Sequence, residues 1–253
     1  MSGSAWASVA TPEIIRTGTQ FGPVPLVPEI RLRQAAEPIG LWQRIEQAAG
    51  RADLDPPFWA FAWAGGQALA RYLLDHPQVV RGRRVIDVAS GSGLVAIAAA
   101  KAGAAAVTAY DIDPLAAAAI EVNAAANAAA SVAANAAASA AAVVAVVAVC
   151  ADILDEDGMP ASGTDLVLVA DAFYTRDLAA KMMRFLQRAA ASGADVLIGD
   201  FGRAYLPRTR LTPLASYDVT GLRALEDSDS KHTTVWSLSG RPAEDGAAEG
   251  RPA

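Results

Sequence analysis

The sequence has very few of the residues that form disulfide bonds and metal centres. Among its 253 residues there are one cysteine, Cys150, and two histidines, His76 and His232. A single cysteine cannot form a disulfide within the chain, and two histidines so far apart do not make a metal-ligand cluster. The sequence therefore predicts neither a disulfide-stapled secreted fold nor a bound metal.

The chain also lacks a basic patch, a membrane-length apolar run and a secretory signal. Its 21 Lys and Arg residues are scattered and are outnumbered by 27 Asp and Glu, which gives a net charge of −6 and argues against a nucleic-acid partner. The most apolar long segment, residues 136–149, is too short to cross a bilayer. The start of the chain has neither the basic nor the apolar region of a secretory signal. We therefore expect a cytoplasmic protein that binds neither nucleic acid nor a membrane.

What the sequence does contain is a regular alternation of short apolar runs and helical patterns. Runs such as "RRVIDV", "DLVLVAD" and "ADVLIGD" alternate with helical segments such as "LVAIAAAKAG" and "RDLAAKMMRFLQRAAASG". This alternation predicts βαβ units, and hence a parallel sheet with helices on both faces. Two later runs, "LASYDV" and "HTTVWSL", predict an antiparallel pair at the sheet edge. The predicted fold is therefore α/β, with a doubly wound and mostly parallel sheet.

The proline-rich beginning of the chain predicts a separate small lobe. We predict an N-terminal lobe over residues 1–57, with little sheet and one amphipathic helix that ends at Gly50. The α/β domain is predicted over 58–240, and a disordered tail over 241–253. Within residues 126–141, an eight-residue alanine-rich repeat offers no titratable group. A solvent-facing helical extension or a loop is expected there, and no chemistry is assigned to it.

A glycine loop follows the first predicted parallel strand. Gly91, Gly93 and Ala96 satisfy the dinucleotide fingerprint, and Asp111 lies where an acid that binds ribose hydroxyls is expected. A tight turn that only needs glycine is less favoured, because this loop has both the preceding strand and the correctly spaced acid. The pattern predicts a nucleotide-type ligand and leaves a nicotinamide-dependent oxidoreductase as one candidate.

Asp87, at the start of this loop, distinguishes between the possible ligands. A carboxylate there would repel a pyrophosphate, but it would attract the ammonium and sulfonium end of S-adenosylmethionine, which has no phosphate. The loop therefore favours S-adenosylmethionine. Asp113 can assist Asp111 or cap the helix that begins at Pro114, and capping is the favoured role. Asp152 can accept a hydrogen bond from an adenine amino group, or it is a surface acid in a turn.

Several motifs together resemble known methyltransferases. "VIDVASGSG", "AYDIDP" and "ADIL" resemble the cofactor motifs of class I S-adenosylmethionine-dependent methyltransferases, a doubly wound fold with seven strands. "VPEIRLR", "PPFWAFAWAGGQALARYLL", "DAFY", "LIGDFGRAYLP" and "KHTTVW" are similar to the electron transfer flavoprotein β-subunit lysine methyltransferases and their bacterial relatives labelled nicotinamide N-methyltransferase-like. The resemblance covers about residues 25–238, and the alanine-rich expansion is its main departure.

The resemblance implies which residues contact the substrate and the cofactor. In that family the D-x-F-Y motif lies beside the cofactor methyl group, so Asp171 and Tyr174 are implied as catalytic residues that orient and hydrogen-bond the amine. Phe173 is implied as a substrate-binding wall, with a core aromatic as the alternative. Trp63 is implied to pack on the cofactor, although an apolar extended segment would also explain it. The candidate cofactor-binding residues are Trp63, Asp87, Gly91, Ser92, Gly93, Asp111, Ile112, Asp152 and Ala170.

These observations predict an S-adenosylmethionine-dependent N-methyltransferase. The favoured substrate is a lysine of the electron transfer flavoprotein β subunit, as the resemblance implies. A small amine or a pyridine such as nicotinamide is the alternative acceptor. A nicotinamide-dependent oxidoreductase and a catalytically silent cofactor-binding protein remain as further alternatives.

Overall fold

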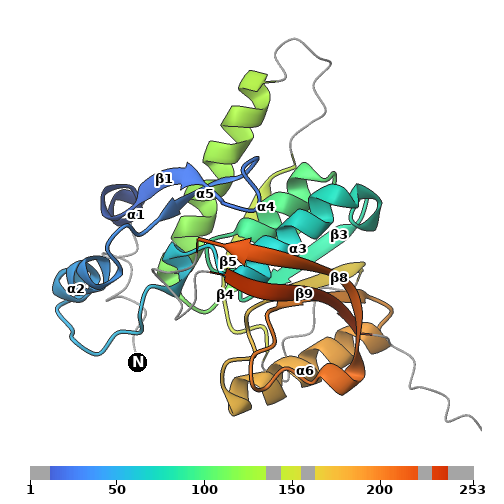
Figure 1. Ribbon diagram of the computed structural model, residues 1–253. Coiled ribbons are helices and arrows are strands. Elements are labelled where there is room, and N and C mark those ends of the chain that lie inside the picture. Colours follow the sequence, from blue (N-terminus) through green and yellow to red (C-terminus); the bar gives the residue numbers. More distant parts are fainter. Residues whose placement is uncertain (1–11, 135–143, 155–162, 222–229, 239–253) are drawn as a thin grey trace, which may run out of the picture.

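A seven-stranded sheet forms the centre of the protein. The structure is a computed structural model, and it describes residues 12–134, 144–154, 163–221 and 230–238. Helices pack on both faces of this sheet, and a smaller two-stranded sheet lies beside it (Figure 1). None of the described helices is long and apolar enough to span a membrane.

Five neighbouring strands of the large sheet are parallel, and an antiparallel pair completes one side. The strands are β3 (Arg84–Val88), β4 (Ala106–Asp111), β5 (Val146–Cys150), β6 (Leu166–Ala170), β7 (Asp195–Asp200), β8 (Leu211–Thr220) and β9 (Ser230–Leu238). Their order is β5-β4-β3-β6-β7-β9-β8, and β9 runs antiparallel to both β7 and β8. This confirms the predicted α/β sheet, including the late antiparallel pair at its edge.

The strands in the middle of the sheet are buried on both faces, which explains their continuous apolar runs. In β6, Val167 and Val169 belong to the core that packs on one helix, whereas Leu166 and Leu168 belong to the core on the opposite face. The helices that form these two layers are α3 (Ala64–Asp75), α4 (Leu94–Lys101) and α5 (Pro114–Ala134) on one face and α6 (Arg176–Ala191) on the other.

The strand order indicates the edge of the sheet where a ligand is expected to bind. The chain adds strands on one side of β3 and then continues on its other side with β6, so a topological switch point lies between these two strands. Ligands of open α/β sheets bind outside the carboxyl ends of the strands at such a point. The loops after β3 and β6 therefore begin where a ligand is expected.

The N-terminal lobe consists of short helices and a small hairpin. Its elements are α1 (Pro12–Gly18), β1 (Gln20–Pro23), β2 (Arg31–Gln34) and α2 (Pro38–Ala49), and the 3-10 helix η1 (Phe58–Ala60) follows it. The predicted end of the amphipathic helix is confirmed, because Gly50 caps α2 with a left-handed φ of 64°. Ile15, Leu41 and Ile45 of this lobe share a hydrophobic cluster with Leu115 of α5. The domain boundary at residue 57 stays a prediction, and the tail 241–253 lies outside the described residues.

Helix α5 continues into the alanine-rich repeat, where one side chain is buried instead of facing solvent. Asn127 accepts a hydrogen bond from the Arg31 amide (3.1 Å) and donates one to the Arg31 carbonyl (2.7 Å). An amide side chain can do both, so it pairs with the edge of the hairpin strand β2. The expectation of a solvent-facing extension was therefore wrong at this position, and residues 135–141 of the repeat lie outside the described residues.

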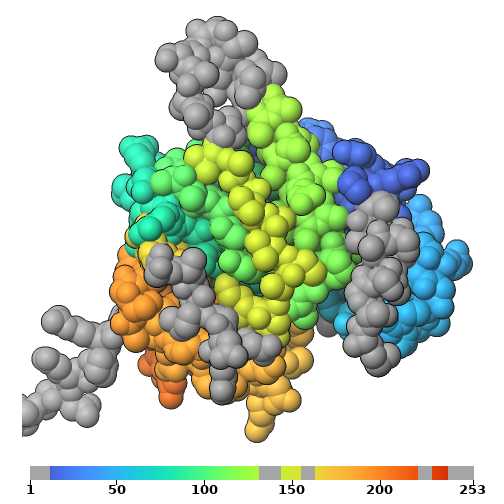
Figure 2. All heavy atoms as spheres, turned by 180° about the vertical axis from the view of Figure 1, so that it is seen from behind, coloured from blue at the N-terminus to red at the C-terminus, as the bar shows by residue number. Residues whose placement is uncertain are grey.

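Figure 2 shows β5 (yellow) at the surface beside α5, as an edge strand should be.

Asn127→Ala is expected to lower the free energy of unfolding by about 1–3 kcal/mol, because it leaves the Arg31 amide and carbonyl without this partner. Urea denaturation followed by circular dichroism measures the change. Glu121→Ala, at an exposed position of the same helix, is the matched control and should change the stability by less than about 0.5 kcal/mol. Equal losses in the two variants would contradict the role assigned to Asn127.

Candidate active site

Four aspartates lie where four neighbouring parallel strands end. Asp87 lies in β3, Asp111 ends β4, Asp171 follows β6 and Asp200 ends β7. Asp87, Asp171 and Asp200 are buried and Asp111 is partly buried. Burial raises the pKa of all four carboxyls, and it raises those of Asp87 and Asp171 to about 7. A bound cation would favour their charged forms, so this edge of the sheet suits a positively charged ligand.

Asp87 organises the glycine loop from inside the protein. Its Oδ2 accepts hydrogen bonds from the Ser90 hydroxyl at 2.5 Å and from the Ala96 amide at 3.1 Å. The carboxylate thereby joins the start of the loop to the first turn of α4. These contacts add a structural role to Asp87, and its attraction for the positive end of a cofactor stays a prediction.

Asp111 joins the glycine loop to the end of the next strand. Its Oδ2 accepts from the Gly91 amide at 2.8 Å, and its Oδ1 accepts from the Asp113 amide at 3.0 Å. Gly93 has a φ of 82°, and a Cβ there would lie only 3.3 Å from Ile120. The loop thus needs glycine both for its backbone conformation and for its close approach to α5.

The predicted capping role of Asp113 is confirmed. Its Oδ1 accepts a hydrogen bond from the Leu115 amide at 2.8 Å, at the first turn of α5. Burial raises the pKa of Asp113 to about 6. Asp113 therefore stabilises the helix start, and Asp111 beside it keeps the better position for a ligand.

The other predicted cofactor residues lie around this loop with different exposure. Ile112, next to Asp111, is 72% exposed, so its apolar side chain is available to a flat ring. Ser92 is buried in the loop, and Ala170 is the last residue of β6. Asp152 is exposed after β5 and accepts from the Leu154 amide at 3.0 Å, which favours its alternative role as a turn acid. Its contact with adenine stays a prediction.

Asp171 follows β6 and is held in an unusual backbone conformation, with its side chain at the start of α3. Its φ is 54°, a left-handed value that costs energy for a residue with a side chain. Its Oδ2 accepts from the Gly66 amide at 3.0 Å, and its Oδ1 lies 3.3 Å from Nη2 of Arg203. The amide lies in the first turn of α3, where the helix dipole favours a negative charge. The strain and these contacts mark Asp171 as a candidate functional residue.

Gly65 in the first turn of α3 lies very close to the sheet. A Cβ on Gly65 would lie 2.2 Å from the carbonyl oxygen of Gly199 in β7 and 2.6 Å from Oδ2 of Asp171. Gly65 therefore allows α3 to pack against the sheet, and this packing brings the Gly66 amide to Asp171.

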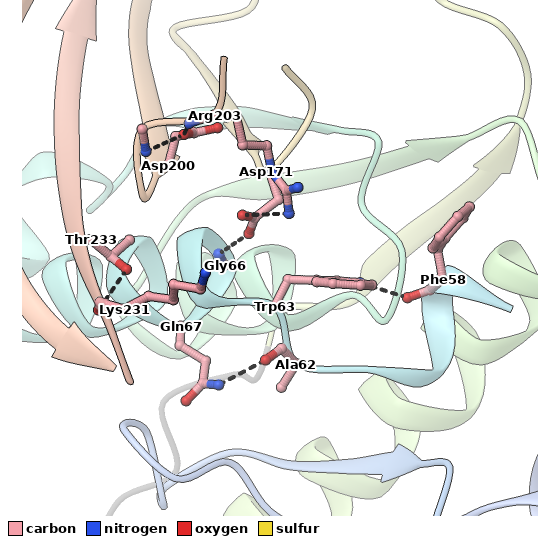
Figure 3. A network of polar contacts seen from close by, with 11 residues as sticks. Phe58, Ala62, Trp63, Gly66, Gln67, Asp171, Asp200, Arg203, Lys231 and Thr233 are labelled. Carbon is pink, nitrogen blue, oxygen red and sulfur yellow. Dashed lines mark hydrogen bonds and ion pairs between the residues drawn. The ribbon is translucent and has the colours of Figure 1, made fainter. Parts of the chain in front are cut away.

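Aromatic side chains form a wall beside Asp171. Trp63 donates from its indole nitrogen to the Phe58 carbonyl at 2.9 Å, and in Figure 3 Trp63 lies near Asp171 with Phe58 beyond it. The ring of Phe58 lies 6.2 Å from that of Trp63 and 6.3 Å from that of Tyr174, measured between centroids. Phe58 and Tyr174 are about half exposed. Trp63 is linked to Asp171 through Arg203, whose guanidinium contacts both, and to Tyr174 through the ring of Phe58.

Phe173 does not belong to this wall. It is fully buried and lies in the same hydrophobic cluster as Met182 and Phe185 of α6. The implied role as a substrate wall is therefore corrected to the alternative that was weighed, a core aromatic. Neighbouring residues point in different directions, so the D-x-F-Y pattern alone does not show which of its side chains face the site and which face the core.

Two further residues of the site were not predicted from the sequence. Asp200 is fully buried and Arg203 contacts Asp171, and both appear in the polar network of Figure 3. An acid at the end of a buried strand, followed three residues later by an arginine, was the available signal. Within the part of the chain that the structure describes, no group of three or more His, Cys, Asp or Glu side chains could hold a metal ion.

Comparison with known proteins places these features in a family. Magnesium protoporphyrin IX methyltransferase from Synechocystis PCC 6803, solved with bound SAM, superposes with a TM-score of 0.46 at 15% identity, over 81% of this chain and 92% of that one. The electron transfer flavoprotein beta subunit lysine methyltransferase of Xenopus laevis is 38% identical over 85% of this chain and 81% of its own length. The corresponding Homo sapiens protein is 36% identical over 84% and 76%. Residues 59–204 match the model of a family described as lysine methyltransferase. By this match and these two relatives, the chain belongs to the lysine methyltransferase family of S-adenosylmethionine-dependent enzymes.

Proposed function

We propose that this methyltransferase methylates lysine side chains of the β subunit of electron transfer flavoprotein. The relatives named for that substrate align over more than three quarters of their own length. The observation that carries the proposal is the acidic edge of the sheet, where Asp171 shares Arg203 with the ring of Trp63, and Trp63 adjoins the exposed ring of Phe58. A lysine side chain has an apolar stem and a positive head, and such a site complements both parts.

The glycine loop and the end of β4 fit S-adenosylmethionine. The cradle around Gly93 would be filled by a Cβ, and Asp111 has acceptor capacity beyond its two amide contacts. We infer that Asp111 binds the ribose hydroxyls, that Ile112 covers the adenine ring and that the loop approaches the amino-acid end. The cofactor supplies an electrophilic methyl group on a positively charged sulfur.

The residues on the acceptor side orient an amine and exclude water. A lysine ammonium has an ordinary pKa of about 10.4 and must lose its proton, with water as the final acceptor, before its nitrogen can take a methyl group. The Asp171 carboxylate accepts a hydrogen bond from this nitrogen and aligns it, although its charge opposes the loss of the proton. Tyr174 provides a second hydrogen-bonding group, and the aromatic wall keeps the site dry.

Asp111→Ala is expected to weaken S-adenosylmethionine binding at least about tenfold, because hydrogen bonds to a carboxylate contribute about 1.5–3 kcal/mol each. Isothermal titration calorimetry measures the dissociation constant. Asp195→Ala removes an exposed aspartate from the opposite end of β7 and serves as the matched control, with no more than a twofold effect expected. An unchanged affinity in Asp111→Ala would remove the ribose role of Asp111.

Purified electron transfer flavoprotein, incubated with the enzyme and methyl-labelled S-adenosylmethionine, is expected to gain mass on β-subunit lysines in steps of one methyl group. Asp171→Asn should reduce this rate at least about tenfold, because a neutral amide orients the amine less well, while cofactor affinity stays within about threefold. Mass spectrometry of peptides measures the gain. Methyl transfer to nicotinamide or a small amine, with none to the flavoprotein, would contradict the proposed substrate.

A further inference from the structure

We propose that Arg203 is a positioning residue for methyl transfer, which holds the Asp171 carboxylate in place and balances its charge. This inference rests on the proposed role of Asp171 as the group that orients the acceptor amine. Arg203 follows the end of β7, so it would join that strand to the end of β6 and to the start of α3. Neither the family match nor the names of the relatives assign a role to this arginine.

The turn after β7 is constructed so that Arg203 points toward Asp171. Asp200 Oδ1 accepts hydrogen bonds from the amides of Gly202 at 2.6 Å and Arg203 at 2.7 Å. Asp200 is fully buried, and Gly202 has a φ of 94°, which permits the sharp turn. In Figure 3, Asp200 and Arg203 lie together above Asp171. A buried carboxylate thus fixes the backbone from which the Arg203 side chain extends.

The guanidinium of Arg203 is held by rings as well as by the carboxylate. Its Nη2 lies 3.3 Å from Oδ1 of Asp171, and only 17% of the Arg203 side chain and 7% of the Asp171 side chain are exposed. Its Cζ lies 4.6 Å from the ring centroid of Phe201 and 5.7 Å from that of Trp63. The pair therefore differs from a surface ion pair, and removing one partner would leave a buried charge uncompensated.

The charges around Asp171 explain why its partner matters for the reaction. Asp200 at the end of β7 opposes ionisation of Asp171, whereas Arg203 and the Gly66 amide of α3 favour it. Burial raises the pKa of Asp171 to about 7 even with these partners present. An opposite charge at this distance lowers a carboxyl pKa by about 1–3 units, so without Arg203 the Asp171 carboxyl would be mostly protonated near neutral pH. A protonated Asp171 cannot attract an ammonium group.

A carboxyl titration tests the pairing directly. In the full-length protein labelled with ¹³C at the aspartate carboxyl, the Asp171 signal is assigned by its loss in Asp171→Asn. Arg203→Gln should shift the midpoint of this signal upward by about 1–3 pH units. Arg210→Gln removes the same charge from an exposed position on the same loop and should leave the midpoint unchanged. An unchanged midpoint in Arg203→Gln would overturn the inference.

The pH profile of methyl transfer tests whether the pairing serves the reaction. In Arg203→Gln the acidic limb of kcat/KM for the protein acceptor should move to higher pH, and Arg203→Lys, which keeps the charge, should restore part of the shift. Cofactor affinity should stay within about threefold, because the pair lies on the acceptor side. A loss that is equal at every pH would mean a structural role only, and would overturn the inference.

A second variant and an independent titration make it possible to distinguish a failure of this inference from a folding defect or from a failure of the proposed function. If Arg203→Gln does not fold, Arg203→Met keeps an unbranched chain over the rings of Phe201 and Trp63 and enters the same titration. If the wild-type enzyme methylates no lysine, the proposed function fails, while the carboxyl titration still decides whether Arg203 balances the charge of Asp171.

Discussion

Four carboxylates held at one edge of a parallel sheet are the constraint on which this structure depends. Burying a carboxylate is unfavourable unless hydrogen bonds compensate it, so each loop after a strand is folded to supply them. The donors are Ser90 and Ala96 for Asp87, Gly91 and Asp113 for Asp111, Gly66 and Arg203 for Asp171, and Gly202 and Arg203 for Asp200. The glycine loop, the start of α3 and the turn after β7 therefore follow from one requirement. In the proposed function, this charge attracts the positively charged end of the cofactor and the lysine side chain before the lysine loses its proton.

The N-terminal lobe is coupled to this edge through a buried amide on α5. Asn123 donates to the Ser92 carbonyl of the glycine loop at 2.9 Å and accepts from the Arg33 amide of β2 at 2.8 Å. The hairpin, the helix and the glycine loop are thus joined at a single side chain. Between the lobe and α3, the Trp63 indole donates a hydrogen bond to the Phe58 carbonyl.

The sequence predicted the features that depend on local pattern. Apolar runs alternating with helices predicted the sheet, and the spacing of Gly91, Gly93 and Asp111 predicted a glycine loop beside the end of the next strand, because these signals lie within one βαβ unit. The family match excludes the nicotinamide-dependent oxidoreductase that this loop pattern alone had left open. Features set by contacts distant in sequence were missed. Asn127 lies in an alanine repeat whose composition hides its burial, and Arg203 meets Asp171 from another strand end.

The most direct test of this account is a crystal structure of the protein with S-adenosylhomocysteine, the product that remains after methyl transfer. The account predicts that the ribose hydroxyls bind Asp111, that the amino-acid end lies against the loop from Gly91 to Gly93, and that the sulfur faces Asp171 and Tyr174. A ligand bound away from the carboxyl ends of β3 and β4, or with its ribose remote from Asp111, would contradict it.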